Sequence, residues 1–192
     1  MPETSLDNCA LIVVDLQQGF DDPAWGRRND TGCESRIAEL TDAWAAAGRP
    51  LVYVQHDSVE PTSPLAPGGT GNRLSELLRP QPDVLIRKRV NSAFHGSPLL
   101  DDWLRARQIS EIAICGATTN HCCETTARVG ANLGYEVLFA LDATFTFDRR
   151  GPDGQLISAD ELARVTATNL HDEFASIVST TALLESRAVG AT

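Results

Sequence analysis

The sequence predicts an α/β fold built on a parallel sheet, and two observations carry the prediction. Six short apolar runs alternate with segments of helical periodicity along the whole chain. Several of these runs are rich in Val and Ile and apolar almost throughout, which is typical of parallel strands covered on both faces. Alternation of this kind over about six units indicates a parallel sheet joined by right-handed crossovers.

The expected elements follow in order along the chain. The expected strands are residues 9–15, 51–56, 84–88, 112–116, 137–141 and 176–179. The expected helices are residues 35–47, 74–78, 98–107, 122–133 and 159–171. The third helix has Ser97 as a candidate N-cap and Pro98 at its first position, and the fifth helix follows Ser158 as a candidate N-cap. Two long connections, 57–71 and 143–157, have the length that often forms a lid or a pocket wall.

Length and charge narrow the class of protein. The chain has 192 residues and a mass of 20.7 kDa, which suits a single domain spanning residues 1–192 with a core of its own. The formal net charge is −10, which argues against a nucleic-acid groove and against docking on an anionic membrane. No apolar run approaches the roughly 18 residues that a bilayer-spanning helix needs. We therefore expect neither a nucleic-acid nor a membrane partner.

The N-terminus and the cysteines favour a cytoplasmic location. The apolar stretch near the N-terminus has no basic residue before it and ends at Asp15, so it is interpreted as a strand and not as a signal peptide. The chain has five cysteines, namely Cys9, Cys33, Cys115, Cys122 and Cys123. An odd number in a chain of this size does not suggest a disulfide framework and fits a reducing compartment.

Three strand ends carry reactive groups. In an open α/β sheet the ligand lies beyond the carboxyl ends of the strands. The first strand ends at Asp15, the third ends at Lys88, and the fourth leads into a segment that contains Cys122. These ends offer a carboxylate, an ammonium and a thiol. Each also has an ordinary structural interpretation, as a turn-forming aspartate, part of a solvated basic patch and a small buried hydrophobe.

The local setting of Cys122 favours a nucleophile. With Thr119 as N-cap, Cys122 would be the third residue of the following helix, where free N–H groups and the helix dipole lower a thiol pKa. The Lys88 ammonium would lower this pKa further, and Asp15 could take the thiol proton. The free N–H groups could also hold the oxyanion of a tetrahedral intermediate. Together these groups are suited to covalent acyl transfer.

Three co-ordered motifs give the chain a family resemblance. They are Asp15-Leu-Gln-Gln-Gly-Phe20, Lys88-Arg-Val-Asn-Ser-Ala-Phe94 and Gly116-Ala-Thr-Thr-Asn-His-Cys122-Cys-Glu-Thr-Thr-Ala-Arg128. With this order and spacing, the chain resembles the isochorismatase-like cysteine hydrolases over residues 10–184. That family includes nicotinamidases, N-carbamoylsarcosine amidase and ureidoacrylate amidohydrolase.

The resemblance implies a fold and a catalytic apparatus. The fold is a six-stranded parallel sheet flanked by helices on both faces, a Rossmann-like three-layer sandwich. The catalytic triad would be Asp15, Lys88 and Cys122. A cis peptide would precede Thr118, and the N–H groups of Thr118 and Cys122 would form the oxyanion hole. A homodimer or homotetramer is also implied.

Departures from the family pattern refine the expected chemistry. Metal-dependent nicotinamidases carry an Asp-x-His pair and a further histidine after the second strand. Here the segment 53–58 contains His56 and Asp57 but no second histidine before His95, so we expect neither a metal nor another cofactor. Isochorismatases that cleave a vinyl ether lack the nucleophilic cysteine. The presence of Cys122 therefore points to a C–N bond in a small amide or carbamoyl substrate.

The loops at the strand ends supply candidates for contact with the substrate. These candidates are Gln17, Phe20, His56, Asn91, Phe94, Asn120 and Phe147. For the three phenylalanines, ordinary apolar packing is an equal alternative. For His56, the alternative is a packed histidine that holds its loop.

Three other functions remain open at the level of the sequence. One is an isochorismatase-type hydrolase of a vinyl ether, which would release pyruvate instead of ammonia. Another is a non-catalytic binding protein with the same fold. The last is a redox-sensing thiol protein, because Cys122 and Cys123 are adjacent.

Overall fold

A computed structural model describes residues 6–186 and contains a six-stranded parallel sheet. The strand order is β3-β2-β1-β4-β5-β8, and every neighbouring pair is parallel. The strands are β1 (Cys9–Val14), β2 (Leu51–His56), β3 (Val84–Lys88), β4 (Glu111–Ala117), β5 (Glu136–Phe145) and β8 (Ser176–Val178). The predicted α/β class and the six strands are confirmed. The strand β5 is longer than expected and takes in part of the connection 143–157.

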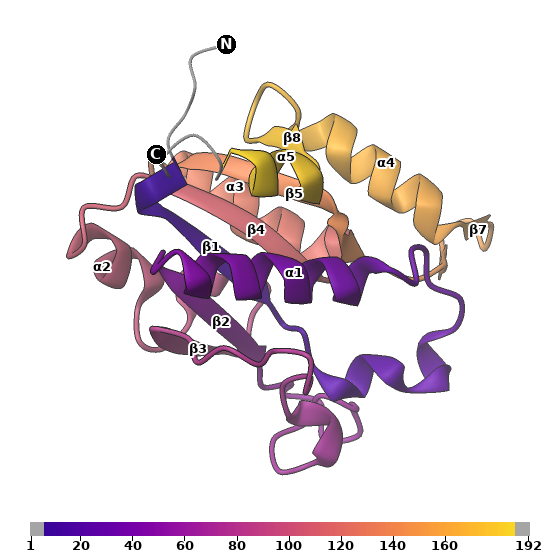
Figure 1. The fold of residues 1–192 in the computed structure, drawn as a ribbon. Coiled ribbons are helices and arrows are strands. Elements are labelled where there is room, and N and C mark those ends of the chain that lie inside the picture. The colour runs from indigo at the N-terminus through magenta and orange to yellow at the C-terminus, as the bar shows by residue number, and fades with distance from the viewer. Residues whose placement is uncertain (1–5, 187–192) are drawn as a thin grey trace.

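Helices cover both faces of the sheet (Figure 1). One face packs against α1 (Cys33–Ala46) and α5 (Thr180–Glu185). The other packs against α2 (Leu100–Arg105), α3 (Glu124–Asn132) and α4 (Ala159–Leu170). Side chains along β1 alternate between the two cores, because successive residues of a strand point to opposite faces: Leu11 and Val13 join the first core, and Ile12 and Val14 join the second. The three-layer arrangement is therefore confirmed.

Short elements complete the chain. The 3₁₀ helices are η1 (Leu6–Asn8), η2 (Gln18–Asp21), η3 (Pro23–Trp25), η4 (Thr70–Asn72) and η5 (Ala93–His95). The segment η6 (Thr119–Cys123) is a π-helix that leads into α3. The strands β6 (Arg149–Arg150) and β7 (Leu156–Ile157) pair as an antiparallel hairpin inside the connection expected to be a loop. Among residues 6–186, no helix is both long and apolar enough to cross a bilayer.

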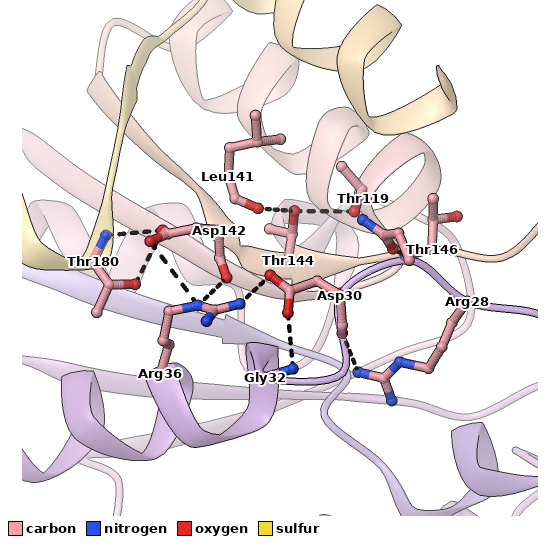
Figure 2. A network of polar contacts seen from close by, with 11 residues as sticks. Arg28, Asp30, Gly32, Arg36, Thr119, Leu141, Asp142, Thr144, Thr146 and Thr180 are labelled. Atoms are coloured by element: carbon pink, nitrogen blue, oxygen red, sulfur yellow. Dashed lines mark hydrogen bonds and ion pairs between the residues drawn. The ribbon is translucent and has the colours of Figure 1, made fainter. Parts of the chain in front are cut away.

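A polar network ties the sheet to α1 and α5 (Figure 2). The Asp142 carboxylate accepts hydrogen bonds from the Thr180 backbone N–H at 2.8 Å and from its hydroxyl at 3.0 Å. The guanidinium of Arg36 donates to the Asp142 carbonyl at 2.6 Å and pairs with Asp30. These contacts anchor α1 beside the end of β5.

Two expected helices differ in the structure. The segment 74–78 is not a helix, because the backbone of Leu74 forms an antiparallel bridge with Gln17. The helix expected at 98–107 begins only at Leu100, so Ser97 is not its N-cap. Instead, the backbone of Ser97 exchanges hydrogen bonds of 2.8 and 2.9 Å with Arg87 of β3. By contrast, the Ser158 hydroxyl caps α4 as predicted, accepting from the Glu161 N–H.

Candidate active site

Three side chains from different strand ends converge at the carboxyl edge of the sheet. Asp15 follows β1, Lys88 ends β3, and Cys122 lies in η6 after β4. The Lys88 Nζ is 2.6 Å from Asp15 Oδ2 and 3.3 Å from Cys122 Sγ. Asp15 and Lys88 are buried, whereas Cys122 is partly exposed. The carboxylate, the ammonium and the thiol therefore lie together at the carboxyl ends of the strands, where a ligand of an open α/β sheet is expected.

The backbone at this edge is unusually constrained. Asp15 has a φ of 50°, in the left-handed region that few non-glycine residues occupy. Gly116, near the end of β4, has a φ of 118°. A Cβ on Gly116 would lie 2.0 Å from the carbonyl oxygen of Val14. Glycine is therefore required where β4 passes β1 and turns toward Cys122.

The turn that carries Cys122 differs from the expected N-cap. The peptide bond Ala117–Thr118 is cis. Thr118, and not Thr119, occupies the N-cap position of η6. The Thr119 hydroxyl instead donates to the Thr144 hydroxyl at 3.0 Å, which donates in turn to a β5 carbonyl (Figure 2). The carbonyl oxygen of Thr118 accepts from the N–H groups of His121 and Cys123 at 3.2 Å each, which fixes the backbone on either side of Cys122.

Burial decides the direction of the pKa shift for Asp15 and Cys122 but not for Lys88. Burial raises the pKa of Asp15 above its ordinary value, although Lys88 opposes the shift. For Lys88, burial works to lower the pKa, but Asp15 and Cys122 raise it above its usual range. Burial, with the Asp15 charge added, raises the pKa of the Cys122 thiol to about 12. The expected depression of the Cys122 pKa is therefore wrong, because burial and Asp15 outweigh Lys88.

His56 lies against the same group. Its Nδ1 is 3.2 Å from Lys88 Nζ. Burial and the Lys88 charge lower the pKa of His56, although Asp15 and Asp57 oppose the shift. An uncharged imidazole therefore faces the ammonium.

A cavity of about 200 Å³ opens above these residues. It is lined by Asp15, Phe20, Trp25, His56, Leu65, Asn91, Thr118, His121, Cys122, Thr146, Phe147, Asp148 and Arg149. Three of the aromatic side chains form one wall: the Phe20 ring centroid is 5.3 Å from that of Trp25 and 6.1 Å from that of Phe147. The cavity thus combines an apolar wall with a polar floor, as small-molecule sites commonly do.

Comparison with known proteins places the chain in a family. Residues 9–170 match the sequence model described as the isochorismatase domain. The chain belongs to the isochorismatase family of hydrolases. This confirms the resemblance carried by the three motifs.

Individual relatives cover most of the isochorismatase-family chain. It is 37% identical to the isochorismatase family protein YrdC of Bacillus subtilis (strain 168), over 91% of this chain and 94% of the relative. It is 33% identical to ureidoacrylate amidohydrolase RutB of Azorhizobium caulinodans, over 73% of this chain and 77% of that protein. A solved isochorismatase-family structure from Chromobacterium violaceum aligns with a TM-score of 0.91 at 37% identity, over 97% and 96% of the two chains.

The structure separates the predicted substrate-contact residues into two groups. Phe20, His56, Asn91 and Phe147 line the cavity, as does Thr118. Three others do not line it: Gln17, Phe94 and Asn120. The side chains of those three make contacts elsewhere, and a substrate contact by them stays a prediction.

Each of the three has another partner. The side-chain amide of Gln17 is buried and pairs with the backbone of His56. Phe94 stacks on Tyr135 in the second core, with ring centroids 5.6 Å apart. Asn120 Oδ1 accepts a hydrogen bond of 2.5 Å from the Thr146 hydroxyl.

Sequence reasoning missed six cavity-lining residues, namely Trp25, Leu65, His121, Thr146, Asp148 and Arg149. Trp25 ends η3 in the connection between β1 and α1, so its place after a strand end was a usable signal. Asp148 and Arg149 belong to the connection expected to be a pocket wall. Leu65 belongs to the other long connection, 57–71, which was expected to form a lid or a pocket wall in the same way.

The family fold also places potential metal ligands together. Asp15, His56 and Cys122 each offer one ligand atom, and these atoms lie within 4.8 Å of one another. Carboxylate, imidazole and thiolate are a ligand set that zinc accepts. However, Lys88 Nζ lies 2.6 to 3.3 Å from an atom of each of the three. The ammonium already contacts all three potential ligands, so a cation bound there would face a buried positive charge.

Proposed function

We propose that this isochorismatase-family hydrolase is a cysteine-dependent amidohydrolase. Its substrate would be a small amide or carbamoyl compound, cleaved at a C–N bond through a thioester on Cys122. The observation that carries the proposal is the convergence of Asp15, Lys88 and Cys122, of which Asp15 and Cys122 line a cavity. The relative named ureidoacrylate amidohydrolase supports C–N bond hydrolysis.

The first step moves the thiol proton to Asp15. Asp15 Oδ2 accepts a hydrogen bond from Lys88, whereas Asp15 Oδ1 is buried and has no hydrogen-bond partner among the described residues. A carboxylate oxygen of Asp15 and the Cys122 Sγ lie within 4.8 Å of each other. Because the thiol pKa is raised to about 12, the resting enzyme holds a neutral thiol. The proton therefore moves to Asp15 as the sulfur attacks.

The following steps return every group to its starting state. The Cys122 sulfur bonds to the carbonyl carbon, and the carbonyl π electrons move onto oxygen. As the tetrahedral intermediate collapses, the C–N bond breaks, and the nitrogen leaves with the proton from Asp15 as ammonia or an amine. Asp15 then takes a proton from water, which attacks the thioester. The C–S bond breaks, the acid leaves, and the sulfur recovers its proton from Asp15.

Lys88 and the backbone would stabilise the charges that develop. Lys88 favours the ionised form of Asp15 and the thiolate character of Cys122 during attack. We assign oxyanion binding to the backbone N–H groups of Thr118 and Cys122. The support is that the neighbouring N–H groups of His121 and Cys123 already donate to Thr118, while Thr118 and Cys122 both line the cavity.

We also propose a cytoplasmic location. All five cysteines are free, as a reducing compartment would keep them.

The proposal is tested with a panel of amide and carbamoyl compounds, read by release of ammonia. Cys122→Ala should lose at least about a thousand-fold in kcat/KM, because it removes the nucleophile. Cys123→Ala is the matched control, because the adjacent thiol is fully buried in the second core and should keep most activity. Equal losses in both variants at unchanged thermal stability would contradict the assignment. With a pyruvyl vinyl ether added to the panel, pyruvate release from it without ammonia release from any amide would indicate vinyl ether hydrolysis instead.

A further inference from the structure

Among residues 6–186, the Lys88 ammonium has three close polar neighbours, as many as it has protons to donate. Its Nζ lies 2.6 Å from Asp15 Oδ2, 3.3 Å from Cys122 Sγ and 3.2 Å from His56 Nδ1. An ammonium carries three donors and no acceptor. In the contact with His56, Nδ1 must therefore be the acceptor. This places the imidazole proton on Nε2.

The surroundings of His56 hold the ring in this role. Its backbone N–H donates to Gln17 Oε1 at 2.9 Å. Its carbonyl oxygen accepts from Gln17 Nε2 at 3.0 Å and from Asn72 Nδ2 at 2.9 Å. Gln17 thereby fixes the end of β2.

We propose that His56 is a positioning residue for Lys88, accepting the third ammonium proton on Nδ1 and thereby directing the other two to Asp15 and Cys122. This inference rests on the proposed function, in which Lys88 must hold both of those groups. His56 acts through Lys88 and is not the base, because the nitrogen that lacks a proton is occupied by the ammonium. A ring protonated on both nitrogens would turn an N–H toward the ammonium and expel it.

The charged and titratable groups around His56 fit an uncharged ring. They are Lys88 of β3, Asp15 after β1, Cys122 of η6 and the adjacent Asp57. Asp57 is itself paired with Arg87, whose nitrogens lie 2.7 and 2.9 Å from its carboxylate oxygens. Asp15 is paired with Lys88. Each carboxylate thus already has a cationic partner, and the pKa of His56 stays lowered although both carboxylates oppose the shift.

The test compares His56→Asn with His56→Leu. The Asn Oδ1 can take the place of Nδ1 as an acceptor, whereas Leu offers none. We expect His56→Leu to lower kcat about 10- to 100-fold with KM changed less than about threefold, because chemistry and not binding is affected. His56→Asn should restore most of kcat. In His56→Leu the acid limb of kcat/KM should move to higher pH, because a less well placed Lys88 holds Asp15 ionised less strongly.

A second readout does not depend on turnover. In ¹⁵N NMR of the full chain, His56 should carry its proton on Nε2 and an unprotonated Nδ1 at neutral pH. His171→Asn, at an exposed histidine that does not line the cavity, should leave both kcat and this signal unchanged.

Three results would overturn the proposal. They are a proton on Nδ1, equal kcat in wild type and His56→Leu, or a rise in KM at constant kcat in His56→Leu, which would make His56 a substrate contact. Failure of the proposed function looks different. In that case the Cys122→Ala variant would match wild type, while the NMR signal would still report the contact with Lys88.

Discussion

The Asp15 side chain is subject to two opposing effects, its role as a base and its burial. It must be ionised to take the thiol proton, yet it is buried beneath the cavity. Lys88 at 2.6 Å stabilises the carboxylate, but burial still raises its pKa above the ordinary value near 3.8. A carboxylate with a raised pKa accepts the Cys122 proton more readily. It is also protonated at a higher pH, and once protonated it cannot act as the base.

This balance predicts the pH dependence of the reaction. Because Asp15 must be ionised and its pKa is raised, kcat/KM should fall with decreasing pH through a limb that lies above pH 3.8. A pH–rate profile of the wild-type enzyme measures this limb. Asp15→Asn, whose side chain tolerates the left-handed backbone, should be inactive at every pH. An acid limb at or below the ordinary aspartate value would contradict the assignment of the base.

The sequence was informative about which side chains meet at the candidate site and less so about their environment. Asp15, Lys88 and Cys122 could be predicted because each follows a strand whose end is recognisable. The pKa of the thiol could not, because it depends on how much solvent the assembled loops exclude. The same holds for Gln17, whose position in the motif gave no sign that it pairs with the backbone of His56.

At the scale of elements, the close passage of β4 against β1 brings the thiol and the carboxylate together. That passage depends on Gly116, where an added Cβ would lie 2.0 Å from Val14 O at a φ of 118°. Gly134, after α3, also has a positive φ of 94°, but nothing lies within 4 Å of an added Cβ. Substitutions at the two glycines can therefore be compared to separate the cost of a steric clash from the cost of backbone strain.

We predict that Gly116→Ala costs about 3 kcal/mol or more of unfolding free energy, because it adds a clash with backbone to a strained φ. Gly134→Ala should cost about 1 kcal/mol, since only the backbone preference is lost. Denaturant unfolding of both variants measures the difference. A Gly116→Ala cost no larger than that of Gly134→Ala would show that the strands are not held in this contact.

The helix starts expected from the local sequence were wrong where the capping residue makes a contact with a distant part of the chain. The pattern at 98–107 predicted a helix start at Pro98, but Ser97 bonds to the backbone of β3 and delays the helix to Leu100. Thr119 is a good N-cap by type, but its hydroxyl is engaged by Thr144. In both cases a partner distant in the sequence outweighed the local preference, which the sequence pattern alone does not reveal.

At the scale of the whole molecule, the strand order explains where the site lies. Connections from β1 run to β2 and β3 on one side, and the later strands β4, β5 and β8 continue on the other. The crevice between β1 and β4 is the point at which the order reverses, where α/β sheets bind ligands. Alternation of strands and helices predicted the sheet, whereas the strand order and the cavity wall arise only from the assembled chain.

The buried charge of Lys88 predicts that the activity does not depend on a metal ion. Lys88 contacts all three side chains that could ligate an ion, and a bound divalent cation would meet its buried charge. We expect activity to survive exhaustive chelation and elemental analysis to find no stoichiometric zinc or iron. One tightly held metal per chain, with turnover lost on its removal and restored by its return, would contradict this expectation.

The central claim is that Cys122 forms a thioester with the substrate, and trapping that intermediate tests it most directly. A compound that the enzyme turns over is mixed with enzyme in excess, quenched in acid within one turnover, and analysed by mass spectrometry of the intact chain and its peptides. The mechanism predicts a mass increase equal to the acyl group on the peptide that contains Cys122. The increase should map to Cys122 in Cys123→Ala and be absent in Cys122→Ala. Turnover by Cys122→Ala at the wild-type rate, or an acyl group carried by Cys123, would contradict the account.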